Sequence, residues 1–241
     1  MNHVQLEYAL TEHPESQKIW KYMDKHLFEI PKVKKNFATE ITSWYPKLTN
    51  FVEKKIDEWE QMHNYKHKCT KGCVHCCKQP ILILGIEKLI ITTYMNEHNL
   101  QSYFDKVKET AIIISSNKLP PPPKLDSHSG IESYKMKYFE ADITCPFLNN
   151  GECVIYPIRP TNCATYSYYG ETVDCDNNPT PDFGVQFSVL EKWMMTQMFN
   201  YFHYNKKKAP YNVTEDKISL LPLAISQQPI SNLRTKTFYK I

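Results

Sequence analysis

The stretch Cys69-Thr70-Lys71-Gly72-Cys73-Val74-His75-Cys76-Cys77 decides how this sequence is interpreted. It places four cysteines in nine positions. On a helix, the last three of them would share one face, where neighbouring side chains lie about 5–6 Å apart. The glycine before them permits a turn, so the first cysteine is expected in a loop at the helix N-terminus, where the dipole and free N–H groups favour thiolate over thiol. Geometry and charge therefore favour metal ligation by this group.

A second group of cysteines lies further along the chain and completes a total of eight. Its members fall within 31 positions, while the first 68 and the last 66 residues contain no cysteine; they are Cys145, Cys153, Cys163 and Cys175. Three prolines fix turns among them, at positions 146, 157 and 160. We therefore expect a loop-rich ribbon that presents its sulfur atoms to the first group.

Composition and charge limit the cellular compartment and the classes of partner that the sequence suits. The N-terminus lacks the charged and apolar regions of a secretory signal, and no run of about 18 apolar residues is present, so the sequence predicts a cytoplasmic protein without membrane contact. In a reducing compartment, thiols stay free for metals or catalysis. The formal net charge is +3, with basic residues spread along the chain, which gives no electrostatic case for nucleic acid. A metal ion is therefore the one partner that the sequence implies, and any protein partner or substrate stays unidentified.

The spacing of apolar residues predicts a mainly α fold. Helical patterns cover 14–30, 45–63, 100–114, 184–204 and 217–226, and the apolar segment 81–95 begins as a short strand over 81–84 before turning helical. The four prolines at 120–123 predict an extended spacer. Both sides of that spacer supply cysteines, so we expect a single domain over 1–241. The cysteine-rich region 69–175 would be its metal-binding part, and 1–68 and 180–241 would be helical extensions.

Two other side chains near the cysteines are candidates. Arg159 is one of only two arginines. Its planar guanidinium next to thiolates would donate fixed hydrogen bonds, which makes it a candidate cofactor-binding residue; the alternative is an ordinary surface arginine. His75 is a candidate ligand, although on a helix it lies about 100° from Cys76 and would point away from the cysteine face.

The order of these motifs resembles a known family. The pattern CxxxCxxCC is followed by Cys145-Pro146-Phe147-Leu148, Gly151-x-Cys153-x-Ile155-Tyr156, Arg159-Pro160 and Cys163. It is similar to the zinc- or iron-chelating cysteine-cluster family, also called YkgJ-like, whose relatives include the flagellin lysine-N-methylases. The resemblance covers about residues 69 to 175. It implies that the metal ligands are Cys69, Cys73, Cys76, Cys77, Cys145, Cys153 and Cys163, with Cys175 a less firm match. This chain has Ala164 where the family usually has arginine.

The sequence is compatible with more than one metal. Eight thiolates suit two closed Cys₄ zinc sites, one Cys₄ [4Fe–4S] cluster with four cysteines left over, or a single ion. Adjacent Cys76 and Cys77 are expected to point in different directions, which favours separate centres or a cluster over one mononuclear ion.

Three functions from different classes are therefore considered. The first is a metal-binding protein that holds zinc or iron through clustered thiolates. The second is an iron–sulfur enzyme that modifies a protein, such as a lysine-N-methylase-like transferase. The spacing Cys69-x₃-Cys73-x₂-Cys76 equals the signature of radical S-adenosylmethionine enzymes, but six glycines and almost no strand pattern argue against their barrel. The third is a thiol redox protein. Two points argue against it: a disulfide between adjacent cysteines is strained, and the sequence shows no thioredoxin-like pattern.

Overall fold

The computed structural model describes residues 3–69, 73–117, 119, 128–170, 183–210 and 219–226. Within them the fold is mainly α, as the sequence predicts, and the strands form only two-stranded ladders. The proline run at 120–123, residues 217–218 of the last predicted helix, and Cys175 lie outside the described residues.

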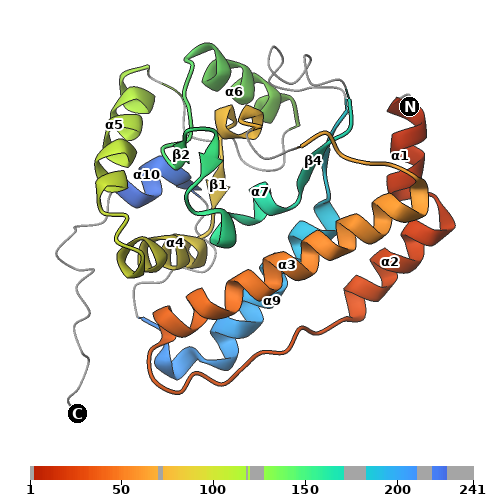
Figure 1. Ribbon diagram of the computed structural model, residues 1–241, viewed down its shortest axis with the longest axis horizontal. Coiled ribbons are helices and arrows are strands. Elements are labelled where there is room, and N and C mark those ends of the chain that lie inside the picture. The colour runs from red at the N-terminus through yellow and green to blue at the C-terminus, as the bar shows by residue number, and fades with distance from the viewer. Residues whose placement is uncertain are drawn as a thin grey trace.

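Three helices form the lower layer in Figure 1: α2 (Pro14–Lys25), α3 (Phe37–His63) and α9 (Ser188–Tyr204). Each packs against the other two, and α1 (His3–Thr11) packs against α2. Aromatic rings fill the space between them. The Trp44 and Tyr201 rings lie 4.6 Å apart, and Phe51 and Trp193 lie 5.1 Å apart, which are distances at which aromatic pairs attract. These rings therefore belong to the core, not to a cofactor site.

Helix α3 begins eight residues earlier than the 45–63 pattern predicts. Asn36 caps it: its side-chain oxygen accepts hydrogen bonds from the backbone N–H groups of Ala38 and Thr39. Pro46 lies inside the helix, close to the start of the predicted 45–63 pattern. At the other end, Asn64 adopts the left-handed conformation, with φ of 53°, and terminates the helix after His63.

Two other predicted helices are shorter than their patterns. Helix α2 ends at Lys25, not at residue 30, because the chain turns extended at His26 and the Phe28 N–H donates to the side chain of Gln197 on α9. Leu27 is consequently 76% exposed. In the 184–204 segment, the first residues form β5 (Gly184–Gln186), which pairs with β4 (Tyr166–Tyr168), and the helix begins only at Ser188. In both cases a tertiary contact overrides the helical pattern.

The upper layer contains α4 (Gly85–Glu97), α5 (Ser102–Ser116), α6 (His128–Glu140) and α10 (Leu221–Ser226). Helix α4 packs against α3 and so joins the layers, while α5 packs against α10. The predicted strand over 81–84 is confirmed as β1 (Leu82–Ile83), which pairs antiparallel with β6 (Ser219–Leu220). Helix α6 was not predicted. The remaining short elements are η1 (His75–Lys78), β2 (Leu148–Asn149), β3 (Glu152–Cys153), η2 (Tyr156–Ile158), α7 (Thr161–Ala164) and η3 (Lys206–Lys208).

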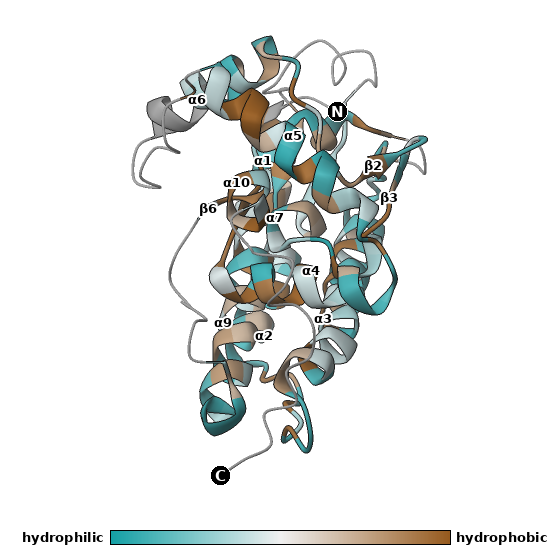
Figure 2. Ribbon diagram, turned by 90° about the vertical axis from the view of Figure 1, so that its left-hand side faces the viewer, coloured by the Kyte–Doolittle hydropathy of each residue, from teal (hydrophilic) through white to brown (hydrophobic). Residues whose placement is uncertain are grey.

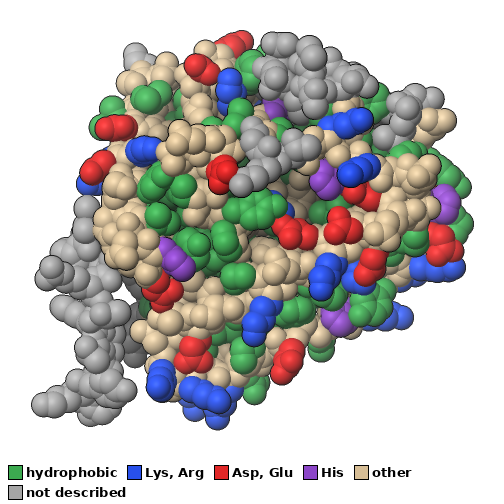
Figure 3. Space-filling model, viewed as in Figure 1, with side chains coloured by type: hydrophobic (Ala, Val, Ile, Leu, Met, Phe, Trp, Pro, Cys, Tyr) green, Lys and Arg blue, Asp and Glu red, His purple; other side chains and the backbone are tan. Residues whose placement is uncertain are grey.

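The described residues give the molecule a surface of mixed charge. Figure 2 shows hydrophilic and hydrophobic residues on different sides of α4, as expected of a helix with one buried face. On the described part of the face in Figure 3, Lys and Arg side chains are interspersed with Asp and Glu. None of the described helices is both long and apolar enough to cross a bilayer.

Candidate metal centre

The first cysteine stretch forms a short 3₁₀ turn and not the predicted α-helix. The turn is η1, closed by the Cys77 N–H donating to the Val74 carbonyl at 2.9 Å, and Cys73 precedes it with an exposed side chain. The prediction that three of these cysteines share one helical face is therefore wrong. The thiols of Cys76 and Cys77 also hydrogen bond to each other, so they do not diverge as expected.

The second stretch begins with a β-hairpin. Strands β2 and β3 pair antiparallel, and the residues between them are Asn150 and Gly151, both with positive φ. Asn-Gly is the preferred sequence for a two-residue hairpin turn of this kind. The register places Leu148 opposite Cys153. The hairpin thus brings Cys153 back toward Cys145, which lies just before its first strand.

The two stretches meet directly. The Cys145 N–H donates to the Cys77 carbonyl at 2.6 Å, although 68 positions separate the two residues. Cys145 and Cys153 lie close enough to interact electrostatically with Cys77, and Cys76, Cys145 and Cys153 do so with Cys163. At the other end of the first stretch, Cys69 interacts electrostatically with Cys73 and Cys76. The seven described cysteines therefore share one region of the molecule.

A buried carboxylate fixes the segment that carries Cys163. Glu87 of α4 is 2% exposed and accepts hydrogen bonds from the Thr161 N–H at 2.7 Å, the Thr161 hydroxyl and the Leu84 N–H. Tyr45 of α3 donates its hydroxyl proton to the Arg159 carbonyl at 3.1 Å. Burial raises the pKa of Glu87. These bonds tie α3 and α4 to the start of α7, which is the helix that contains Cys163.

Arg159 lies beside the thiols and not on the open surface. Its side chain is 16% exposed, one terminal nitrogen bonds Glu53 of α3 at 2.5 Å, and the guanidinium stacks on the Tyr156 ring at 4.3 Å. Its Nε is buried without a hydrogen-bond partner. The positive charge acts to lower the pKa of Cys76, Cys153 and Cys163. The arrangement leaves Nε–H as a buried donor of a guanidinium whose charge reaches three of the cysteines.

Burial makes most of these thiols hard to ionise. It raises the pKa of Cys69 to about 11 and that of Cys145 to about 12, and it also raises the pKa of Cys153 and of Cys163. Cys76 is the exception, because the hydrogen bond from Cys77 and the charge of Arg159 lower its pKa. Buried thiols of this kind ionise readily only opposite a positive charge.

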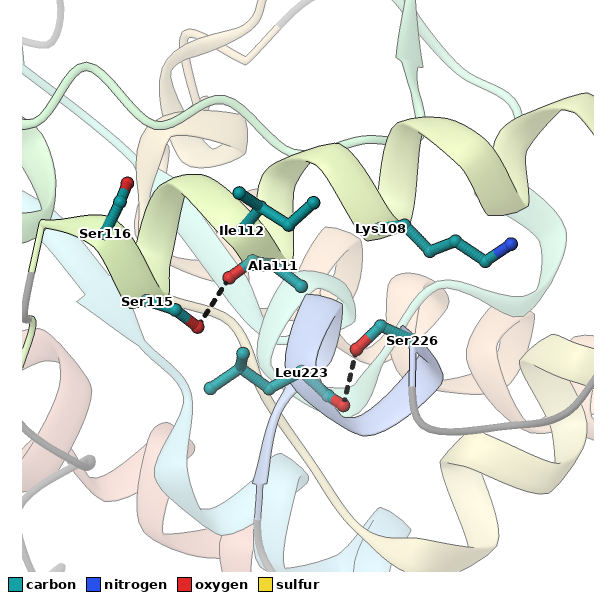
Figure 4. Close-up of a pocket in the computed structure, with 7 residues that line it drawn as sticks. All are labelled: Lys108, Ala111, Ile112, Ser115, Ser116, Leu223 and Ser226. Carbon is teal, nitrogen blue, oxygen red and sulfur yellow. Dashed lines mark hydrogen bonds between the residues drawn. The ribbon is translucent and has the colours of Figure 1, made fainter.

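Other predicted features lie elsewhere or outside the described residues. Nothing can be said of the position of Cys175. His75 is 2% exposed and lies on the 3₁₀ turn of the first group, between Cys73 and Cys76 in the sequence. An open surface pocket of about 740 Å³ lies between α5 and α10 (Figure 4); residues such as Lys108, Ile112 and Leu223 line it, and no cysteine does. The pocket is therefore separate from the candidate centre.

One family model matches this chain. It is CxxCxxCC, described as "Putative zinc- or iron-chelating domain", and it covers residues 68–181. Residues 68–181, slightly less than half of the chain, are similar to this family and are named the CxxCxxCC domain. No curated protein and no solved structure matches the chain significantly. The CxxCxxCC domain contains all eight cysteines and Arg159, whereas α1, α2, α3 and α9 lie outside the matched residues.

The chemistry of the CxxCxxCC domain suits a soft or borderline metal, since its donors are clustered thiols with a cation beside them. The side chains do not by themselves form a coordination sphere. Across the described ranges, no three side chains of His, Cys, Asp or Glu are arranged so that they could hold one ion.

Proposed function

We propose that this protein chelates zinc or iron through thiolates of its CxxCxxCC domain. The proposed ligands are Cys69, Cys73, Cys76, Cys77, Cys145, Cys153 and Cys163, with Cys175 as a further candidate. The observation that carries the proposal is the direct backbone bond between Cys145 and Cys77, which joins the two stretches. The family's description, as zinc- or iron-chelating, agrees with it.

A bound metal cation supplies the positive charge against which buried thiols ionise. Residues of this chain supply further positive charge and position the cysteine segments. Arg159 places positive charge beside the thiolates and keeps Nε–H available to donate to a sulfur atom. Glu53 and Tyr156 hold the guanidinium in position. Glu87 fixes the segment of Cys163. Such supporting contacts orient metal ligands and typically change metal affinity 10–100-fold when removed.

The decisive experiment is elemental analysis of protein purified without oxygen, together with its absorption spectrum. Bound zinc with a colourless solution identifies a zinc site, and bound iron with visible charge-transfer bands identifies an iron–sulfur cluster. Cys145→Ser should reduce bound metal, and Lys47→Ser on α3 serves as the control. A protein without bound metal that also takes up neither zinc nor iron when titrated contradicts the proposal.

A thiol redox function is the second candidate, and the hydrogen bond between the Cys76 and Cys77 thiols favours it. One thiol with a lowered pKa beside one with a raised pKa is the arrangement that promotes attack on a disulfide. Counting reactive thiols in the native protein separates the candidates. Redox cysteines should react with an alkylating reagent without a chelator, whereas metal ligands should be protected until the metal is removed.

The same proposal places the protein in the cytoplasm and treats residues 1–241 as one domain. The seven described cysteines are free thiols, which suits a reducing compartment.

The main cluster of buried side chains includes residues from Leu6 in α1 to Ile225 in α10, so the helices outside the CxxCxxCC match pack together with those inside it. Thermal unfolding with one transition by two probes, in the presence of metal, would support a single cooperative domain.

A further inference from the structure

One end of the lower helical layer gathers lysines from two distant parts of the chain. Three of them lie in the loop before α3, and three form η3 directly after α9. The members of this lysine cluster, all exposed, are Lys32, Lys34, Lys35, Lys206, Lys207 and Lys208. Figure 1 shows the start of α3 and the end of α9 at the same end of the layer, at the lower left, and basic side chains are visible there on the face in Figure 3.

Buried contacts hold the two groups of lysines together. Asn205, just before η3, is 5% exposed. Its side-chain oxygen accepts a hydrogen bond from the Val33 N–H at 2.8 Å, and its side-chain nitrogen donates to the Pro31 carbonyl at 3.2 Å. Beside this contact, the rings of Phe37 and Phe202 lie 6.0 Å apart. The loop before α3 is therefore fixed against the end of α9, although 172 positions separate Val33 from Asn205.

The charge of the lysine cluster is not compensated locally. Segments 29–40 and 201–210 contain six lysines against two glutamates, so their formal charge of +4 exceeds the +3 of the whole chain. One of those glutamates, Glu40, accepts hydrogen bonds from the backbone N–H groups of Lys34 and Lys35. Among the residues that the structure describes, none forms an ion pair with the six ammonium groups. This end of the molecule consequently attracts anions.

The chemistry of the lysine cluster favours an anionic lipid surface over a nucleic acid. Its charges are ammonium groups without an arginine, and these lack the planar donors that bind phosphates and bases in fixed geometry. Tyr204, next to the cluster, is 65% exposed. Tyrosine rings, apolar in body and polar at the hydroxyl, are enriched where lipid meets water. Clusters of about four to eight basic residues are typical of segments that bind phosphatidylserine-rich membranes.

We propose that the lysine cluster binds the anionic headgroups of a lipid bilayer, at the surface and reversibly. The sequence-based expectation of no membrane contact rests on the lack of a long apolar segment, and it takes no account of lysines that meet only in the tertiary fold. The cluster lies outside residues 68–181, so membrane binding is independent of metal chelation. In the cytoplasm, the membrane surface that faces the protein carries anionic lipids.

Co-sedimentation of the full chain with vesicles tests the proposal. Phosphatidylcholine vesicles with about 30% phosphatidylserine should bind the protein at about 0.15 M salt, and pure phosphatidylcholine vesicles should not. Each lysine near such a surface contributes about five-fold to binding. Replacement of all three lysines of η3 by glutamine should therefore lower the partition coefficient about 100-fold. The substitutions are Lys206→Gln, Lys207→Gln and Lys208→Gln.

The other half of the lysine cluster is tested in the same way. Lys32→Gln, Lys34→Gln and Lys35→Gln, combined in one chain, should lower the partition coefficient by a similar factor. If this second triple variant binds as well as the parent, the two groups do not act as one surface and the proposal is overturned. For a variant whose helical circular dichroism differs from that of the parent, the salt dependence of the parent replaces it: about 0.5 M salt should release the bound protein.

A matched triple variant separates the lysine cluster from net charge. Lys21→Gln, Lys25→Gln and Lys54→Gln remove the same charge from exposed positions of α2 and α3, outside the cluster, and should leave binding nearly unchanged. An equal loss in this control overturns the proposal, as does a parent that binds neither kind of vesicle or binds both equally. A duplex oligonucleotide that binds through the same lysines and displaces the protein from the vesicles would assign the cluster to nucleic acid instead.

Discussion

Arg159 differs from the many lysines of this chain in what its geometry permits. Its guanidinium bonds Glu53 and stacks on Tyr156 while Nε stays buried without a hydrogen-bond partner. A lysine ammonium has no planar face to stack and no second fixed donor, so it cannot hold the Glu53 contact and a sulfur contact in one geometry. The choice of arginine at this position is therefore explained by shape as well as by charge.

Arg159→Lys is expected to weaken metal binding about 10-fold, within the range for residues that support metal ligands. The charge is retained, so the loss measures the fixed hydrogen bonds. Competition between the protein and a chromophoric chelator gives the affinity. Glu53→Gln should weaken binding in the same direction, because it releases the guanidinium. Equal affinities in parent and Arg159→Lys would show that the arginine acts only as a distant charge.

Among the elements, the N-terminus of α3 depends on a carboxylate outside the centre. Glu40 accepts hydrogen bonds from the backbone N–H groups of Lys34, Lys35 and Asn36. Burial acts to raise the pKa of Glu40, but these bonds outweigh it and lower the pKa. A carboxyl group with a lowered pKa in the folded state stabilises the fold above its unfolded pKa, near 4.3, and loses that effect as the pH falls through the folded value.

Glu40→Gln should therefore destabilise the protein at pH 7, by about 1 kcal/mol or less because the side chain is partly exposed. The difference between parent and variant should shrink as the pH is lowered through the Glu40 pKa. Urea unfolding at pH 7 and at pH 3 measures both differences. Glu12→Gln, in the turn that follows α1, is the matched control. A difference that stays constant across this pH range would assign the effect to packing and not to ionisation.

Helices with a long apolar stripe could be predicted from the sequence, and the cysteine segments only in part. Helix α5 follows its pattern within two residues. Helix α3 does not, because its start depends on the Asn36 cap and its path through Pro46 depends on tertiary packing. The hairpin that contains Cys153 could have been predicted from Asn150-Gly151, which is a preferred two-residue turn sequence. No sequence pattern indicated the contact of Cys77 with Cys145 or the bond between Glu60 and His67, because only the tertiary fold brings these residues together.

For the whole molecule, apolar packing and metal binding stabilise different regions. The buried aromatic side chains between α2, α3 and α9 require no metal, and Trp44, Trp59 and Trp193 each donate the indole N–H to a partner. The cysteine segments contain two-residue strands and short turns, whose few ladder bonds contribute little stability alone. The bound metal is therefore expected to stabilise the cysteine segments most.

Removal of the metal by a chelator should consequently loosen residues 145–164 while α3 and α9 stay folded. Metal at 100 times its dissociation constant stabilises a fold by about 2.7 kcal/mol per site, which corresponds to a Tm shift of roughly 5–11 °C for a chain of this size. Hydrogen exchange measured by mass spectrometry distinguishes the regions. Exchange should accelerate in 145–164 after chelation and change little in 44–59 and 190–202. Uniform acceleration across all three would mean that the helical layer also depends on the metal, which its independent aromatic packing argues against.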